Sequence, residues 1–374
     1  MRKRIWYLLI VVFLLLGFPQ KVRAADYEEE ILSQISFTEI EQLWEEELGT
    51  NDLTFFEVFQ GLLHSEHQGT KKDVVKLAAE YMLGEVKECR PLLVQILVIT
   101  IAFSFLHNFI NVFQNSQITQ TGFYLYFLIM MVLLMRSFQT MYQLTDHVLE
   151  VCCDFMQALI PAFCMTMSFA SAATTAMAFY QISLVVMGLV ERALQTIFLP
   201  GVQTFVVLEM LNHMTDGRLL MKLTALMKSV LRWGLRAMFA GVAGMNVIEH
   251  MIAPSVDNLN KMTITKTLGM IPGLGSTAEA VSNLLIGSAV VIKNGLGAAA
   301  ILALVILCAG PFLKLLILTF LYRAAGAVIL PLANKRVCGC MESVGEGAVL
   351  LLSVMTSCLL MFLITIAVVV TALR

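Results

Sequence analysis

Long apolar segments separated by short polar breaks make up most of this chain. The run from Gly295 to Leu313 contains no charged residue and is about as long as a bilayer crossing requires. It lies in an almost unbroken apolar block that ends near Leu332, and it is rich in Gly and Ala, which let helix backbones approach closely in lipid. The pattern predicts an all-α, polytopic membrane protein.

Further apolar segments predict how the spans are arranged within residues 91–374. We expect about seven to nine spans in total, with the number after residue 284 left open between two full spans and a short re-entrant helix plus two. The segments expected before the basic stretch at 216–237 are 92–113, 123–144, 155–170, 176–199 and 202–214. Later segments are expected at 237–253 and 347–373.

The N-terminus has the pattern of a secretory signal. Met1 to Arg4 is basic, residues 5–18 are apolar, and Val22 and Ala24 form a small-residue cleavage site. We expect a signal peptide at 1–24, with an uncleaved signal anchor as the alternative. In either case, the residues that follow start outside the cytoplasm.

Residues 25–90 form the one long polar region, with sixteen Asp and Glu against five Lys and Arg. Three Thr-x-x-acid patterns, beginning at Thr38, Thr54 and Thr70, are typical of helix N-termini. Apolar residues follow each at helical spacing, so we predict three short amphipathic helices in a small extracytoplasmic region. This region is either a simple cap on the membrane domain or a docking module for a partner.

Two further segments differ from the spans. The stretch at 216–237 predicts a basic amphipathic helix at a cytoplasmic membrane interface, because its cations share one face; these are Arg218, Lys222, Arg232 and Arg236. The stretch at 254–282 is rich in Gly, Pro and Ser and predicts an external loop.

Ionisable residues at membrane depth are the main candidates for function, because each costs several kcal/mol unless it is paired or hydrated. The candidates for a polar passage or for pairing between helices are Arg136, Glu191, Arg192, Glu209 and Lys293, with Glu209 and Lys293 as possible partners of each other. Candidate hinge or re-entry positions are Pro161, Pro272, Gly273, Gly275 and Pro331. Snorkelling at the interfaces is the alternative for each charge.

Composition narrows the class further. The chain is 58% apolar and 14% charged, with a mean hydropathy of +0.80, and its net charge of −2 indicates no nucleic-acid partner. The eight Cys form neither a disulfide framework nor metal-site spacing. The sequence contains no metalloprotease, serine-hydrolase or phosphate-loop motif, so we predict no catalytic residues, no metal and no cofactor.

Two motifs resemble a known family. They are the run Ile271-Pro272-Gly273-Leu274-Gly275-Ser276-Thr277-Ala278-Glu279-Ala280, leading into Gly287 and Lys293-Asn294-Gly295, and the run Leu159-Ile160-Pro161 before a Ser/Ala/Thr stretch. With the order of signal, acidic region and polytopic domain, they make the chain similar to the stage III sporulation protein AE family of endospore-forming bacteria.

The resemblance implies a place and a role. Members lie in the mother-cell membrane around the forespore. They belong to a channel or secretion-like complex with stage III sporulation proteins AA to AH and stage II sporulation protein Q. It also implies a non-enzymatic component, with energy supplied by an ATPase partner. A stand-alone secondary transporter of small solutes is the alternative, favoured by the Pro-containing helices and buried charges.

Overall fold

The computed structural model describes residues 35–48, 54–63, 116–169, 173–214, 220–268, 275–329 and 335–371, together with the single residues 84, 87, 94, 98, 101 and 105. Within these residues the elements are all helices, which confirms the all-α prediction. They are α3 (Thr38–Leu48), α4 (Phe55–Leu63), α6 (Ser116–Phe169), α7 (Ala173–Ala193), the π-helix η1 (Leu194–Phe198), α8 (Leu199–Met214), α9 (Met221–Leu268), α10 (Gly275–Ile329) and α11 (Lys335–Thr371).

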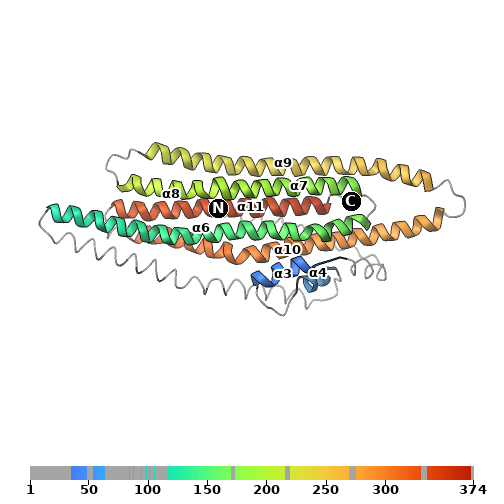
Figure 1. The fold of residues 1–374 in the computed structure, drawn as a ribbon, viewed down its shortest axis with the longest axis horizontal. Coiled ribbons are helices and arrows are strands. Elements are labelled where there is room, and N and C mark those ends of the chain that lie inside the picture. Colours follow the sequence, from blue (N-terminus) through green and yellow to red (C-terminus); the bar gives the residue numbers. More distant parts are fainter. Residues whose placement is uncertain are drawn as a thin grey trace.

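The long helices lie side by side along one axis, with alternating chain directions (Figure 1). α6, α9 and α10 contain 54, 48 and 55 residues, and at about 1.5 Å per residue each is roughly 70–80 Å long. The C-terminal ends of α8 and α10 and the N-terminal ends of α9 and α11 share one end of the bundle. The bundle is therefore much longer than a bilayer is thick.

Four helical segments among the described residues are long and apolar enough to cross a membrane: Phe127–Thr166, Gln181–His213, Gly287–Ala327 and Cys338–Val370. Two pairs of predicted spans are corrected by this result. The segments expected at 123–144 and 155–170 are one helix, α6, and those at 176–199 and 202–214 form one continuous run through α7, η1 and α8. The segment expected at 92–113 lies outside the described residues except for four single positions, so the total of seven to nine stays a prediction.

The segments predicted at 176–199 and 202–214 are separated at Pro200, but the π-helix η1 lets the helix continue through this residue. Proline cannot donate a backbone hydrogen bond, and helices accommodate this by local π-helical turns. Here the Leu199 N–H donates to the Leu194 carbonyl across the wider turn. α6 likewise continues through Pro161 as far as Phe169.

The loop predicted at 254–282 is wrong over most of its length. α9 extends to Leu268 and α10 begins at Gly275, so helix covers all of this segment except 269–274. The reason is that the backbone-breaking residues are concentrated at 269–275, whereas 255–268 contains none. Pro272, Gly273 and Pro331 lie outside the described residues, and Gly275 is the first residue of α10.

α3 and α4 pack against the sides of α6 and α10, near the middle of the bundle (Figure 1). The ring of Phe55 meets Phe155 of α6 edge-on, and the side chains of Phe59 and Leu63 approach Gly295 of α10. The predicted capping box at Thr54 is confirmed: the Thr54 N–H donates to Glu57, and the Glu57 N–H donates to the Thr54 hydroxyl.

The corresponding box at Thr38 is not formed, because Glu41 is used elsewhere. Its carboxylate accepts the backbone N–H groups of Phe55 at 3.2 Å and Phe56 at 2.8 Å, and so caps α4 from α3. The signal peptide expected at 1–24 and the helix expected after Thr70 lie outside the described residues.

Candidate functional site: a polar face on α6

One face of α6 is polar along a length comparable to the thickness of a bilayer. Between residues 136 and 160, every exposed side chain is polar. These residues, which we call the α6 stripe, are Arg136, Thr140, Gln143, His147, Glu150, Asp154 and Gln157. Their spacing of three and four residues places them on one side of the helix, and the stripe rises about 32 Å.

The outward face of α6 changes character at residue 136. One to three turns earlier, the exposed residues are Leu125, Leu128, Ile129 and Val132, which are 50–62% exposed. That apolar face is typical of contact with lipid, while the stripe is typical of contact with water or protein.

Wherever the bilayer lies along Phe127–Thr166, it covers part of the stripe. A crossing needs about 20 residues, and every window of that length within Phe127–Thr166 contains at least three stripe residues. Window 127–146 contains Arg136, Thr140 and Gln143, and window 147–166 contains the other four. A charged side chain costs about 2.5–3.5 kcal/mol at the centre of a lipid-exposed helix. The stripe therefore faces water or another protein.

The flank of α6 beside α7 and α8 adds further polar groups. Gln203 of α8 donates to the Gln139 side chain at 3.4 Å. The Glu191 side chain lies against the Cys153 thiol, and the carboxylates of Asp154, Glu150 and Asp146 act on it electrostatically. This half of the polar face is therefore acidic.

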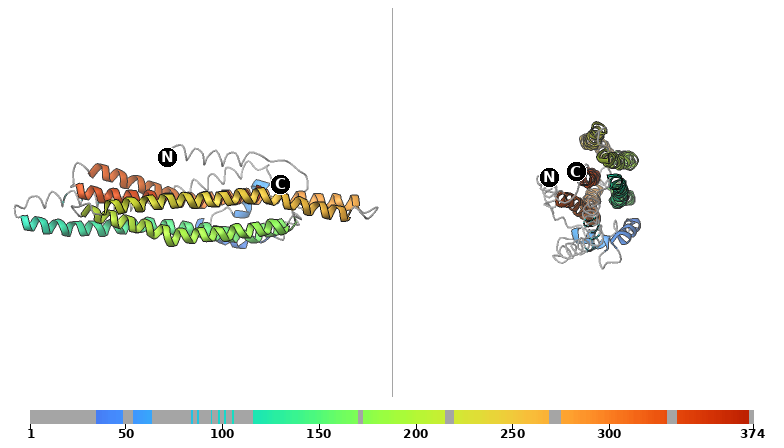
Figure 2. Two further views of the ribbon diagram at one scale, coloured as in Figure 1. Left: turned by 90° about the horizontal axis from the view of Figure 1, so that it is seen from above. Right: turned by 90° about the vertical axis from the view of Figure 1, so that its left-hand side faces the viewer.

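α3 borders the opposite flank of the stripe. The His147 ring lies 3.2 Å from the Glu47 carboxylate. An end-on view shows α6 at the edge of the bundle, between α7–α8 on one side and α3 on the other (Figure 2). The stripe thus forms the outward face between these two elements.

The structure places the five predicted passage residues in different surroundings. Arg136 lies on the stripe, Glu191 is half-buried on its flank, and Arg192 is exposed next to Glu191 on α7. Glu209 is instead near His213, at 4.0 Å, and Lys293 is buried within α10 with a relative exposure of 1%.

Pairing between Glu209 and Lys293 is ruled out by their positions along the bundle. Met210 beside Glu209 contacts Cys340 of α11, whereas Gly297, one turn from Lys293, contacts Val370 of α11. Cys340 and Val370 are thirty residues apart on one helix, which corresponds to about 45 Å.

Sequence reasoning missed six of the seven stripe residues. Glu150 and Asp154 fell between the spans predicted at 123–144 and 155–170, because polar residues at this density commonly end an apolar segment. Gln143 was interpreted as an interruption near the end of the first of these spans. The signal that could have identified them is the three-and-four spacing continued through 136–157.

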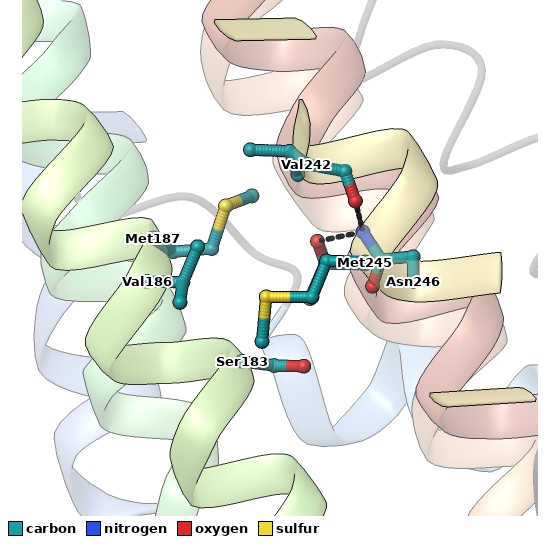
Figure 3. A pocket seen from close by; sticks show the side chains of 7 residues that line it. Ser183, Val186, Met187, Val242, Met245 and Asn246 are labelled. Carbon is teal, nitrogen blue, oxygen red and sulfur yellow. Dashed lines mark hydrogen bonds between the residues drawn. The ribbon is translucent and has the colours of Figure 1, made fainter. Parts of the chain in front are cut away.

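A second polar feature lies between α7, α9 and α11. The Asn246 amide donates to the Val242 carbonyl at 3.0 Å and to the Thr365 hydroxyl at 3.1 Å. Ser183 completes the polar lining of a cavity of about 10 Å³, with Val186, Met187, Val242 and Met245 around it (Figure 3). The cavity has room for about one water molecule.

The predicted cytoplasmic-interface residues lie on α9 where the structure describes them. Lys222, Arg232 and Arg236 are exposed, and Arg218 falls outside the described residues. Lys228 joins this helix to the bundle through an ion pair with Glu346 of α11. The basic segment is thus the first part of a long bundle helix and does not form a separate element.

The described residues contain no group of three or more His, Cys, Asp or Glu side chains that could hold a metal ion. Cys152 and Cys308 approach to 3.5 Å between sulfurs, deep in the core. The polar face on α6 is therefore the strongest candidate for a functional site within the described residues.

Comparison with known proteins identifies the family. The family model for stage III sporulation protein AE matches residues 53–372. The stage III sporulation protein AE of Bacillus subtilis (strain 168) is 22% identical over 391 residues, covering 100% of this chain and 98% of that protein. No solved structure matches the chain. These matches confirm the resemblance seen in the sequence: the chain belongs to the stage III sporulation protein AE family.

Proposed function

We propose that this chain is a non-enzymatic, multi-pass component of a channel or secretion-like complex between mother cell and forespore, and that the α6 stripe lines its passage through the membrane. Family membership supports the role in sporulation. The observation that carries the passage is the stripe itself, a polar face that no crossing within Phe127–Thr166 can present to lipid.

The proposed location is the mother-cell membrane around the forespore. The bundle end that carries the starts of α9 and α11 is basic, with Lys222 near one start and Lys335 and Arg336 at the other. The positive-inside rule assigns this end to the cytoplasm. The N-terminal region from residue 25 then starts on the outer side, where α3 and its neighbours would contact partners.

The proposed partners are the other stage III sporulation proteins, AA to AH, and stage II sporulation protein Q. A pull-down of the detergent-solubilised protein from sporulating cells, followed by mass spectrometry, tests this. We expect several of these proteins to co-purify from sporulating cells and none from vegetative cells. Recovery of the chain alone from both would contradict membership of a complex and favour a stand-alone transporter.

Water access along α6 tests the passage directly. Single cysteines at Thr140, Gln143 and Gln157 should react in native membranes with a membrane-impermeant, water-soluble thiol reagent. Matched controls at Leu128 and Ile129, on the apolar outward face of the same helix, should not react. The seven described native cysteines are buried or half-buried, and Cys89, which lies outside the described residues, is replaced by Ala in every variant. Equal labelling at stripe and control positions would overturn the proposed passage.

A further inference from the structure

A second charged surface lies on α9. Lys228, Arg232 and Arg236 follow one another at four-residue spacing and so share one side of the helix. We call these three residues the α9 basic edge. Arg232 and Arg236 are exposed, and the pair between Lys228 and Glu346 turns this side of α9 toward α11.

The α9 basic edge and the α6 stripe face opposite sides of the bundle. The face of α6 opposite the stripe is buried against α10 and α11, since Phe138 lies beside Gly347 and Cys152 beside Cys308. The stripe therefore points away from α11, while the basic edge lies on the α11 side of α9. The end-on view shows α9 and α6 at separate edges, with α7–α8 between them (Figure 2).

The two surfaces also lie at the same height along the bundle. Ser137 of α6 accepts from the Tyr322 hydroxyl, and Gly345, next to Glu346, lies against Tyr322 and Arg323. Lys228 is thus level with Ser137. Because α6 and α9 run in the same direction, Arg236 is about level with residue 145, one turn before Glu150.

The charges of the two surfaces are complementary. The adjoining part of the stripe and its flank carry the carboxylates of Asp146, Glu150, Asp154 and Glu191. Copies of a membrane protein share one orientation in the bilayer, so surfaces that meet between copies must lie at the same height. The α6 stripe and the α9 basic edge meet this condition and face opposite ways.

We propose that the chain assembles head to tail with further copies of itself, with Arg232 and Arg236 of one copy facing the carboxylates of Asp146 and Glu150 on the next. Because the two surfaces differ, the contact is heterologous and continues into a ring or a row. The inference deepens the proposed function and rests on it: the passage lined by the α6 stripe then runs along the seam between copies, with α9 as its second wall.

Cysteine crosslinking tests the contact in native membranes. The double variant Arg236→Cys with Glu150→Cys should give dimers, trimers and larger products on mild oxidation, because each copy has a free partner on both sides. Either single variant should give none. A matched control combines Glu150→Cys with Gly241→Cys, which is exposed, about level with Glu150 and roughly 140° around α9 from Arg236, and should also give none. Absence of the series, or dimers from a single variant, would overturn the proposal.

Charge reversal separates a second copy from anionic lipid as the occupant of the basic edge. Arg232→Glu with Arg236→Glu should lower co-purification of two differently tagged copies by roughly tenfold or more, as expected for loss of close charge pairs. Adding Asp146→Arg and Glu150→Arg to the same chain should restore it. Failure to restore, with the reversed α9 alone reducing membrane levels, would assign the basic edge to lipid and overturn self-assembly.

The two experiments fail independently. Water labelling of the stripe without a crosslinked series would leave the passage standing and remove the assembly. A crosslinked series without water labelling would leave the assembly standing and remove the passage.

Discussion

The inner and outer faces of α6 have opposite chemistry along the same stretch of the helix. The inner face carries Phe138, Leu149, Phe155 and Phe163, each no more than 1% exposed. It packs against α10 and α11, and Phe155 meets Phe55 of α4. The outer face carries the stripe, where each exposed residue is polar. The inner face therefore determines how the bundle holds together, and the outer face determines what the bundle contacts. Substitutions on the two sides should separate stability from function.

A large effect is expected at Gly297, where a side chain of α11 lies directly against the α10 backbone. At Gly297 of α10, an added Cβ would overlap the Val370 side chain of α11. Gly297→Leu should therefore lower the free energy of unfolding by about 3 kcal/mol or more, the upper range for overpacked cores. Chemical unfolding of the detergent-solubilised protein, followed by circular dichroism, measures it.

The same helix offers a matched control for this substitution. Gly287 is ten residues earlier on α10, and an added Cβ there meets nothing within 4 Å. Gly287→Leu should leave the unfolding free energy within about 0.5 kcal/mol of the parent. Similar losses for both variants would mean that the close approach of α10 and α11 does not control stability.

Adjacent residues on α6 give the sharpest form of the comparison. Phe155 is buried against Phe55, and Asp154 is on the stripe. Phe155→Ala should cost about 3–5 kcal/mol of unfolding free energy, whereas Asp154→Ala should change it by less than about 0.5 kcal/mol. Asp154→Ala should nevertheless lower spore yield at normal protein levels, by removing one carboxylate from the polar face.

The reverse result would break the comparison. If Asp154→Ala destabilised the protein as strongly as Phe155→Ala, the stripe would be a structural surface. If it left spore yield unchanged, the stripe would be a solvated face without a role in transport.

The inner face was largely predictable from sequence, and the outer face was not. Apolar residues over 123–144 and 155–170 correctly predicted helix at both places, because hydrophobic runs report burial or lipid contact directly. Their union into one helix was missed. Composition averages over all sides of a helix, so the polar stretch at 145–154 resembled a break between spans.

Two places where a helix was expected to end show the same limit of prediction from sequence. Pro200 was expected to end a helix by its local chemistry, yet η1 absorbs it through the bond from Leu199 to Leu194. Residues 255–268 contain no breaker, so α9 continues through them despite their polar composition. In both cases the helix continues through residues that the sequence pattern assigned to a break or a loop.

A moderate effect is expected at the polar contact between α9 and α11. Asn246→Leu removes the donor to Thr365 in a site with relative exposures of 3% and 1%. Hydrogen bonds between membrane helices contribute about 0.6–2 kcal/mol, so we expect a loss in this range. A double-mutant cycle with Thr365→Val measures it as a coupling energy, and a coupling near zero would show that the pair does not hold α9 to α11.

The smallest effect is expected at the contact between the stripe and α3. The His147 ring lies 3.2 Å from the Glu47 carboxylate, and the two side chains are 53% and 21% exposed. Exposed pairs contribute about 0–1 kcal/mol, because water screens the attraction and ordering two side chains costs entropy. Glu47→Gln should therefore hardly change the unfolding free energy, since Trp44 and Phe55 hold α3 and α4 in place by burial. Hydrogen exchange of the α3 amides gives the local measure. A marked increase in α3 exchange for Glu47→Gln would mean that the polar face of α6, and not its apolar side, anchors the N-terminal helices.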